Sequence, residues 1–421
     1  MKLYLINLNP MLKNLGEAIT WIESQVRFKP KADLNRMKSA YLSLDLDLSK
    51  VKKIHVAGTN GKGSVCAYLS NTLIEAGYKV GTFTSPYLVS FHERIRYQFK
   101  DIKDDELLDL IRTIASFNQS FEKDYGESLS FFELLTLMSL IYFDQKKVDV
   151  IVIEVGIGGL LDATNILNYD LSLITSIGFD HMKQLGNTLE SIAYNKLGIL
   201  KPGNHLITTV DQALYPYFKD HIKKASITAE YYSVKDLKKM NDIPLIFQLD
   251  DMVYQLPLIG EYQLLNALIS IKAIHYLFPY ILDEEIARGL ENTVWPGRLD
   301  EIDYHIYIDG GHNTHAIEAL KQSALSTFKD KKIWVLFSAL SDKDISGMLD
   351  IIESFTQRIF ITTFPDPRFK ELTEFLRENI EYKENSLDAL CELKGMMDDD
   401  TILIVTGSLH FVGYIKNHYQ K

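Results

Sequence analysis

The stretch KKIHVAGTNGKGSV, Lys52 to Val65, decides the fold. A hydrophobic run ends at Ala57, a glycine-rich turn follows, and apolar residues at helical spacing continue beyond it. Glycines let backbone N–H groups approach phosphate oxygens, the following helix adds its dipole, and Lys62 supplies a positive charge. The usual P-loop spacing is not met, because the hydroxyl comes one position late, at Ser64. The stretch nevertheless predicts a phosphate-binding loop between a strand and a helix.

Short β-branched runs and helical patterns alternate on both sides of this loop. VDVIVIEVG, LSLITSIG and HLITTV are typical of buried strands, whereas FFELLTLMSLIYF and TLESIAYNKLGIL are typical of helices. This rhythm predicts an α/β fold with a mostly parallel sheet and helices on both of its faces. The more polar segment from about Ala229 to Gln255 indicates a strand-like addition to the sheet edge, and a helix is expected from about Tyr262 to Leu277.

A second alternation begins after NTVWPGRLDEI, whose Pro-Gly pair is typical of a hinge. A chain of 421 residues is too long for one compact core, so two domains are expected. We predict a P-loop nucleotide-binding domain over residues 1–295 and a smaller Rossmann-like α/β domain over residues 296–421.

Composition narrows the class of protein. The chain is 46% hydrophobic and 24% charged, with a formal net charge of −11, which argues against a nucleic-acid partner. Cys66 and Cys391 are its two cysteines, too few for a disulfide framework. The first residues have too short an apolar run for a signal peptide, and no later run is long enough to span a membrane. These features predict a cytoplasmic protein.

Polar side chains follow several of the predicted strands. Glu154 ends a long apolar run, Ser85 in GTFTSP comes just past a strand, and His181 follows LSLITSIG. Because parallel strands end at one edge of a sheet, where α/β proteins bind ligands, these side chains are expected to lie together. A carboxylate beside nucleotide phosphates usually holds magnesium. For His181, a metal-binding and a structural role are equally compatible with this pattern.

A set of motifs in one order resembles a known family. HVAGTNGKGS, FTSPYLVSFHERIR, FFELLT, IEVGIGGLLDATN, TSIGFDH, WPGRLD, DGGHN, SDKD and GSLHFVG occur as in the folylpolyglutamate synthetase and dihydrofolate synthetase family of the Mur ligase superfamily. The upstream LNRMKSAYLSL resembles the family's N-terminal helix. The similarity covers nearly the whole chain, and the folate-branch motifs favour this family over other Mur ligases.

The resemblance implies an ATP-dependent amide ligase. The γ-phosphate of ATP would pass to a carboxylate of a reduced folate or of dihydropteroate, and the amino group of L-glutamate would attack the acyl phosphate. Two anions must meet in this reaction, so Lys62 and magnesium would neutralise charge. Members of the family are mostly monomers.

The resemblance also assigns site residues by position. It implies a triphosphate cradle of Thr59, Asn60, Gly61, Lys62, Gly63 and Ser64, with further nucleotide contacts from Asn266, Arg298 and Asp309. It implies two Mg²⁺ ions with Ser85, Glu154, His181 and Lys196 as ligands, Lys196 being carbamylated. It implies catalytic roles for Lys62, Lys196 and His312, and substrate contacts from Phe132, Asp162, His312 and Ser408. The local pattern around Lys196, taken alone, favours a solvated helix residue.

Several positions depart from the usual family residues. Leu160 stands where an arginine is common, Asn195 where a glutamate is common, and Tyr262 where a histidine is common. None of them removes a predicted phosphate or metal ligand, so an active enzyme with altered substrate preference is expected. The alternatives are a ligase for another carboxylic acid, a P-loop ATPase or kinase, and a relative that binds nucleotide or folate without catalysis. Dihydrofolate synthesis and glutamate-tail extension are both compatible with the motifs.

Overall fold

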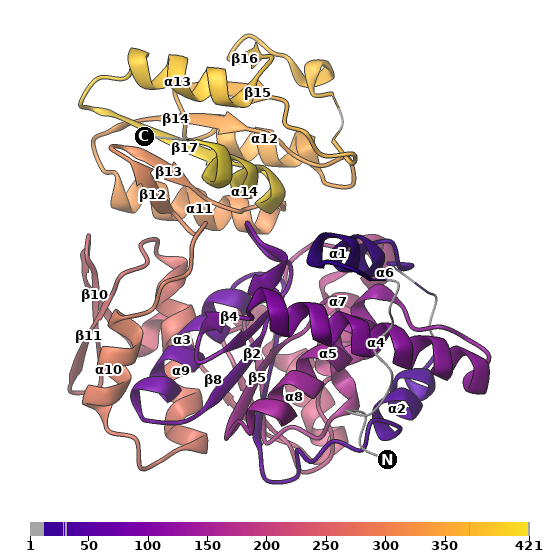
Figure 1. The fold of residues 1–421 in the computed structure, drawn as a ribbon. Helices are drawn as coiled ribbons and strands as arrows, with labels where there is room; N and C mark the ends of the chain where they lie inside the picture. Colours follow the sequence, from indigo (N-terminus) through magenta and orange to yellow (C-terminus); the bar gives the residue numbers. More distant parts are fainter. Residues whose placement is uncertain (1–11, 28, 30–31, 370, 420–421) are drawn as a thin grey trace. The chain divides into compact units, whose positions relative to one another are not determined.

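The computed structural model describes residues 12–27, 29, 32–369 and 371–419 (Figure 1). The chain forms two compact units. The first runs to Ile177 and includes His181–Ser233 and Leu268–Gly289, while the second comprises Gly178–Asp180, Val234–Ala267 and the chain from Leu290 onward. The predicted α/β class is confirmed, since each unit contains a sheet with parallel strands and packed helices. The boundary at residue 296 stays a prediction.

The first unit is built on an eight-stranded sheet of order β4-β3-β2-β5-β1-β6-β7-β8. Its strands are β1 (Lys52–Ala57), β2 (Val80–Phe83), β3 (Ile95–Tyr97), β4 (Lys100–Asp101), β5 (Val150–Glu154), β6 (Leu171–Ile174), β7 (His205–Thr208) and β8 (Thr228–Tyr231). The six neighbouring strands β2, β5, β1, β6, β7 and β8 pair in parallel. Strands β3 and β4 are added next to β2 in antiparallel pairing. The central strand β5 is buried along its whole length, as its uninterrupted apolar run predicts.

Helices cover both faces of this sheet. They are α1 (Leu15–Glu23), α2 (Asn35–Leu42), α3 (Lys62–Glu75), α4 (Asp104–Tyr125), α5 (Phe131–Lys146), α6 (Met182–Leu185), α7 (Leu189–Leu197) and α8 (Tyr215–Ala225), together with α9 (Tyr262–Leu277) and α10 (Asp283–Glu291), which have residues in both units. Phe143 of α5 packs against Gly81 on one face, and Ser70 of α3 bonds to Thr82 on the other. The phosphate loop therefore leads from β1 into a helix on the face opposite α5.

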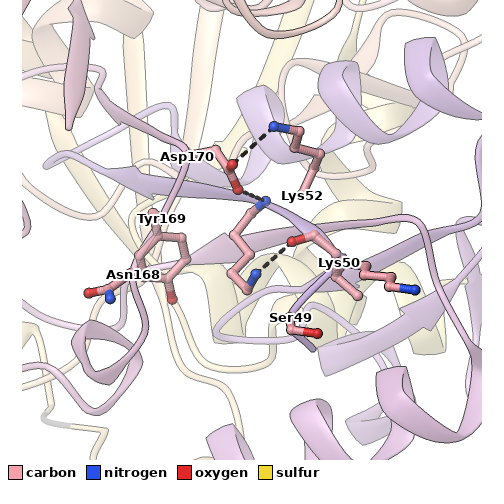
Figure 2. A pocket seen from close by; sticks show the side chains of 8 residues that line it. Ser49, Lys50, Lys52, Asn168, Tyr169 and Asp170 are labelled. Atoms are coloured by element: carbon pink, nitrogen blue, oxygen red, sulfur yellow. Dashed lines mark hydrogen bonds and ion pairs between the residues drawn. The ribbon is translucent and has the colours of Figure 1, made fainter. Parts of the chain in front are cut away.

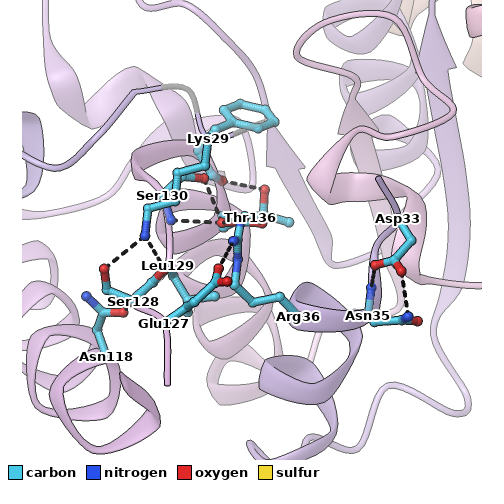
Figure 3. Close-up of polar contacts among 12 residues, drawn as sticks. Lys29, Asp33, Asn35, Arg36, Asn118, Glu127, Ser128, Leu129, Ser130 and Thr136 are labelled. Atoms are coloured by element: carbon cyan, nitrogen blue, oxygen red, sulfur yellow. Dashed lines mark hydrogen bonds and ion pairs between the residues drawn. The ribbon is translucent and has the colours of Figure 1, made fainter. Parts of the chain in front are cut away.

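A buried ion pair fixes the start of α5. Glu133 is 1% exposed at its side chain, accepts from the Ser130 backbone and hydroxyl, and pairs with Arg36 of α2 at 3.0 Å. Figure 3 shows the surrounding contacts, in which Arg36 also bonds to Glu127 at 2.6 Å. Because Ser130 caps α5, this network sets the position of the helix that carries Phe132.

Replacing Arg36 by Met should destabilise the protein by about 3–5 kcal/mol, because Glu133 would keep its charge in a buried place without its cationic partner. Urea unfolding of the two proteins measures the difference. The double variant Arg36→Met/Glu133→Gln should recover much of the loss, since Gln keeps the shape and the capping bonds. A loss under about 1 kcal/mol in the single variant would mean that solvent compensates the carboxylate.

The second unit contains two sheets. A six-stranded sheet has the order β12-β13-β17-β14-β15-β16, and an antiparallel sheet has the order β11-β10-β9. The elements are β9 (Lys238–Asp242), β10 (Leu245–Leu249), β11 (Met252–Leu256), β12 (Asp300–Asp303), β13 (Ile306–Ile308), β14 (Lys332–Phe337), β15 (Arg358–Thr362), β16 (Ile380–Lys383), β17 (Thr401–Thr406), α11 (Thr314–Thr327), α12 (Ile345–Glu353), α13 (Ser386–Met396) and α14 (Leu409–His418). Apolar side chains of α11 and α12 share one core with alternate residues of β14 and β17.

One expectation about the first sheet is wrong. Of the segment from about Ala229 to Gln255, only β8 extends the eight-stranded sheet, whereas β9, β10 and β11 pair with one another in the second unit. The same polar strand pattern suits an edge strand and a separate meander, so the pattern alone could not distinguish them. Within the described ranges, none of the helices combines the length and hydrophobicity needed to span a bilayer. The first eleven residues, on which the signal-peptide expectation mostly falls, lie outside the described residues.

Candidate active site

The carboxyl ends of four neighbouring parallel strands carry the predicted site of the first unit. These strands are β2, β5, β1 and β6, in that order across the sheet. Ser85 follows β2, Glu154 ends β5, Gly58 follows β1, and His181 caps α6 beyond β6. The backbone N–H of Ser85 donates to Oε2 of Glu154 at 2.9 Å, so two of the predicted metal ligands are in contact. Sheet topology thus brings Ser85 and Glu154 together, as predicted, although they are far apart in sequence.

Glycines are required at two points of the phosphate loop. Gly58 has φ +154°, and a Cβ there would lie 1.9 Å from Oγ1 of Thr175. Gly61 has φ +86° at the N-cap of α3, a left-handed conformation that glycine adopts without strain. The loop is fixed to the end of β6, since Thr59 N donates to the Ser176 carbonyl at 2.8 Å and Asn60 N to the Ser176 hydroxyl at 3.0 Å. The loop is therefore rigidly held with its N–H groups at a helix N-terminus.

Two lysines of the site share one acceptor. Lys62 Nζ donates to the Gly58 carbonyl at 3.2 Å, and Lys196 Nζ donates to the same oxygen at 2.8 Å. Lys196 is 4% exposed, so the interpretation of its local sequence pattern as that of a solvated helix residue is wrong. Lys62 also lies 4.0 Å from Oε1 of Glu154. The sequence pattern missed this burial because α7 turns Lys196 toward the loop, which depends on packing and not on local spacing.

The donors of the first unit fit a divalent cation shared with phosphates. Glu154 is a buried carboxylate at the sheet edge, and the Ser64 hydroxyl is buried with no hydrogen-bond partner among the described residues. No cluster of three or more His, Cys, Asp and Glu side chains suited to a metal occurs in the described part of the chain. Mg²⁺ needs no such cage, because it usually takes one or two carboxylates together with substrate phosphates and water.

Phe132 and Asp162 both lie against one glycine, Gly156. A Cβ at Gly156 would be 2.5 Å from the Phe132 ring and 3.1 Å from Oδ2 of Asp162. Asp162 is buried, and its Oδ2 accepts from the backbone N–H of Ile157 at 3.0 Å. Gly156 comes two residues after Glu154, so an aromatic ring and a carboxylate contact the loop that directly follows the candidate metal ligand. This arrangement suits a flat, polar-edged ligand.

Leu160 and Asn195, two residues that depart from the family pattern, are neighbours in the structure. The backbone N–H of Leu160 donates to the Asn195 carbonyl at 2.7 Å. The Asn195 side chain donates to the carbonyls of Leu185 and Ser191 at 3.3 and 3.0 Å. Both residues are therefore engaged in joining the loop after β5 to α6 and α7, and neither leaves a buried charge at this contact.

The predicted nucleotide residues Asn266, Arg298 and Asp309 lie in the second unit. Asn266 donates to the Gln263 side chain at 3.0 Å, and Arg298 to the Gly297 carbonyl at 2.9 Å. Asp309 accepts from the Leu299 backbone at 3.0 Å and from the Tyr262 hydroxyl at 2.8 Å. The departure at Tyr262 thus acts on Asp309, a contact across 47 residues that no local sequence signal reveals.

His312 and Ser408, also in the second unit, have different surroundings. His312 Nδ1 lies 2.9 Å from the Gly310 carbonyl, and its Nε2 lies 3.4 Å from Asp180. Asp180 also pairs with Lys343 at 2.8 Å, and these two residues were missed by the site assignment although TSIGFDH and SDKD contain them. The Ser408 hydroxyl accepts from His410 N at the start of α14, which is an N-cap contact.

A pocket at the opposite end of β1 is separate from these residues. Figure 2 shows its lining, which includes Lys52, Lys53, Tyr169 and Asp170. Asp170 accepts from the Lys53 backbone at 2.8 Å and pairs with Lys52 at 3.2 Å. Because Lys52 begins β1 whereas the phosphate loop follows its end, this pocket lies at the amino edge of the sheet. It is therefore not the predicted reaction site.

Comparisons with known proteins give the family. The Mur ligase middle domain matches residues 56–274, and the Mur ligase glutamate ligase domain matches residues 297–409. The dihydrofolate synthase/folylpolyglutamate synthase of Bacillus subtilis is 34% identical over 95% of this chain and 98% of its own length.

Solved structures agree with this relationship. Escherichia coli FolC in complex with DHPP and ADP has a TM-score of 0.86 and 27% identity, covering 96% of this chain and 97% of its own. A bifunctional folylpolyglutamate synthase/dihydrofolate synthase with Mn, AMPPNP and L-glutamate bound has a TM-score of 0.83 and 29% identity, covering 98% and 99%. The chain therefore belongs to the folylpolyglutamate synthase/dihydrofolate synthase family of Mur ligases and is an ATP-dependent ligase that forms carbon–nitrogen bonds.

Proposed function

We propose that this ligase joins L-glutamate to a carboxylate of a reduced folate, of dihydropteroate, or of both. The observation that carries the proposal is the placement of Phe132 and Asp162 against Gly156, two residues beyond Glu154 at the end of β5. The Phe132 ring can stack on a pterin, and the Asp162 carboxylate can accept from ring N–H groups. The DHPP and L-glutamate found in complexes of similar proteins support the same acceptor and donor here.

ATP would lie on the phosphate loop. Thr59 to Ser64 would form the triphosphate cradle, in which Thr59 and Asn60 are tied to Ser176 while the backbone N–H groups of residues 61–64 and the Lys62 ammonium would face the phosphates. Asn266, Arg298 and Asp309 would contribute further nucleotide contacts. The nucleotides bound by similar proteins support this assignment. Ser64, Ser85, Glu154, His181 and a carbamylated Lys196 would hold up to two divalent cations. Such cations, when bound, reduce the repulsion between the γ-phosphate and the substrate carboxylate.

The residues of the chain then bind and orient the reactants. Lys62 would follow the γ-phosphate as a substrate carboxylate oxygen bonds to phosphorus and the bond to ADP breaks. The amino nitrogen of glutamate would next bond to the acyl carbon, with loss of inorganic phosphate and a proton. His312 and Ser408 would contact the substrates, and the region over residues 296–421 would bind glutamate. We further infer a monomeric, cytoplasmic enzyme.

ADP release with ATP, Mg²⁺ and L-glutamate tests the proposal, with dihydropteroate and tetrahydrofolate compared as acceptors. Glutamate-dependent turnover with dihydropteroate would establish dihydrofolate synthesis, and turnover with tetrahydrofolate would establish tail extension. Turnover with both would make the enzyme bifunctional. Absence of turnover with both acceptors, despite measurable ATP binding, would overturn the proposed acceptor class and favour another carboxylic acid as the acceptor.

A further inference from the structure

His55 is a fully buried histidine to which the proposed reaction gives no part. It lies in β1, with Ile153 of β5 and Ser172 of β6 as its register partners. Its ring stacks on Tyr169, with 3.9 Å between centroids and 10° between planes. The Tyr169 hydroxyl donates to the Thr164 carbonyl at 2.7 Å. His55 and Tyr169 therefore form a rigid support beneath the turn η3 (Ala163–Ile166).

Hydrogen bonds run from His55 to Asp162 in one direction. The Thr164 hydroxyl lies 2.8 Å from His55 Nε2 and 2.6 Å from Oδ1 of Asp162. An ionised carboxylate can only accept, so the single hydroxyl proton of Thr164 points to Asp162. The hydroxyl oxygen must then accept from His55 Nε2–H. The tautomer of His55 is thereby defined by the contacts of Thr164.

The other ring nitrogen agrees with this assignment. His55 Nδ1 is buried and has no hydrogen-bond partner among the described residues, so it carries no proton that would need an acceptor. Burial, with the nearby Lys201 as a smaller cause, holds the pKa of His55 well below its usual range. The ring is therefore neutral near pH 7 and can donate only through Nε2.

Asp162 is the last residue in this series of hydrogen bonds. In the proposed function it also forms a wall of the acceptor site. Its Oδ1 accepts from both the hydroxyl and the backbone N–H of Thr164, the latter at 3.0 Å. Its Oδ2 accepts from Ile157 N and faces Gly156, against which the Phe132 ring also lies. A rotation of the Thr164 hydroxyl would break the shorter of the two contacts to Oδ1 and leave the Asp162 carboxylate held by the backbone N–H groups of Thr164 and Ile157 alone, with more freedom to turn.

We propose that His55 is a positioning residue for the acceptor substrate: through Thr164 it fixes the Asp162 carboxylate in the orientation that binds the pterin ring. This role rests on the proposed function, in which Asp162 contacts the acceptor. His55 touches neither ATP nor glutamate in this scheme. Its loss should therefore raise the KM for the acceptor while leaving the KM for ATP unchanged, whereas a purely structural histidine would affect both alike or neither.

The test compares three substitutions in the full-length enzyme. His55→Phe keeps an aromatic ring against Tyr169 and removes the donor, and it should raise the KM for the acceptor roughly tenfold, the loss expected for one buried hydrogen bond. His55→Gln can place an N–H donor near the former Nε2 and should restore most of the acceptor KM. Thr164→Val removes the relay with almost no change in volume and should match His55→Phe.

Two controls separate positioning from general damage. Ser172→Ala alters the buried register partner of His55 on β6, whose hydroxyl has no partner among the described residues, and should leave the KM for every substrate unchanged. The double variant His55→Phe/Thr164→Val should have an acceptor KM no higher than that of either single variant, because both substitutions break the same series of hydrogen bonds. If His55→Phe fails to fold in thermal melts, Thr164→Val and His55→Gln still decide the outcome.

The outcomes are distinguishable. An acceptor-specific rise in KM with rescue by Gln supports the proposal. Wild-type turnover together with an unchanged acceptor KM in Thr164→Val and His55→Phe overturns it and leaves the proposed function intact. Equal effects on the KM for ATP and for the acceptor also overturn it. Absence of wild-type turnover with both dihydropteroate and tetrahydrofolate would overturn the proposed function and this role of His55 with it.

Discussion

The Lys196→Ala variant should lose at least about 10²-fold in turnover while binding ATP nearly as well as the wild type. Lys196 and Lys62 both donate to the Gly58 carbonyl, so two ammonium groups would lie close together beside the bound triphosphate and its cations. Addition of CO₂ to the Lys196 amine, with loss of a proton, would replace one of these positive charges by a carboxylate-like anion. That change would favour divalent cations at this place and would give the buried Lys196 a role in holding them.

Steady-state ADP release and calorimetric titration with a non-hydrolysable ATP analogue measure the two expected effects. Acetate or formate should partly restore turnover to Lys196→Ala by supplying the missing carboxylate. Enzyme incubated with ¹³C-bicarbonate should show a carbamate resonance that the variant lacks. The exposed Lys183 on α6 offers a control, since Lys183→Ala also removes a lysine charge from a helix of the first unit and should leave turnover unchanged. Full turnover by Lys196→Ala would defeat the carbamate assignment.

The parts of the fold with a strong periodic signal were predictable from the sequence. Within VDVIVIEVG, the four residues from 150 to 153 are apolar without interruption before Glu154, which is typical of a strand covered on both faces, and β5 is buried along its whole length. The loop after β1 was predictable because it needs glycine at two places. A side chain at Gly58 would collide with Thr175, and the backbone of Gly61 has a left-handed conformation that other residues rarely adopt. Parallel pairing then placed Ser85 and Glu154 at one edge without any knowledge of contacts.

Contacts between distant segments were not predictable. His55 and Thr164 are 109 residues apart, and neither stands out locally from an ordinary strand or turn residue. Tyr262 was identified as a departure from the family pattern, but its bond to Asp309 depends on how α9 and the loop after β13 fold together. The same holds for β9 to β11, whose alternating pattern determines a strand but not the sheet that it joins. Side-chain burial and pairing arise from tertiary packing, which periodicity does not encode.

The Glu154→Gln variant should lose at least about 10³-fold in turnover at saturating Mg²⁺, because several kcal/mol of charge stabilisation at the reacting phosphate depend on a bound cation. Gln has the same shape, and its carbonyl oxygen can still accept from Ser85 N, so the fold of the sheet edge should persist. The substitution therefore removes a charge from the predicted metal site and little else. Lys62, 4.0 Å from Glu154, would also lose an anionic neighbour.

Titration of turnover against Mg²⁺ concentration separates a metal effect from a general loss. The wild type should lose its turnover in the presence of a chelator and regain it with added Mg²⁺. The Glu154→Gln variant should need far more Mg²⁺ and never reach the wild-type rate. Asp170→Asn is the matched control, since it changes a carboxylate to an amide at the amino edge of the same sheet, away from the phosphate loop. Its turnover and metal requirement should equal those of the wild type. If Glu154→Gln had an unchanged metal requirement, the cation would have to be held by other groups, and the lost turnover would be assigned to the orientation of Lys62.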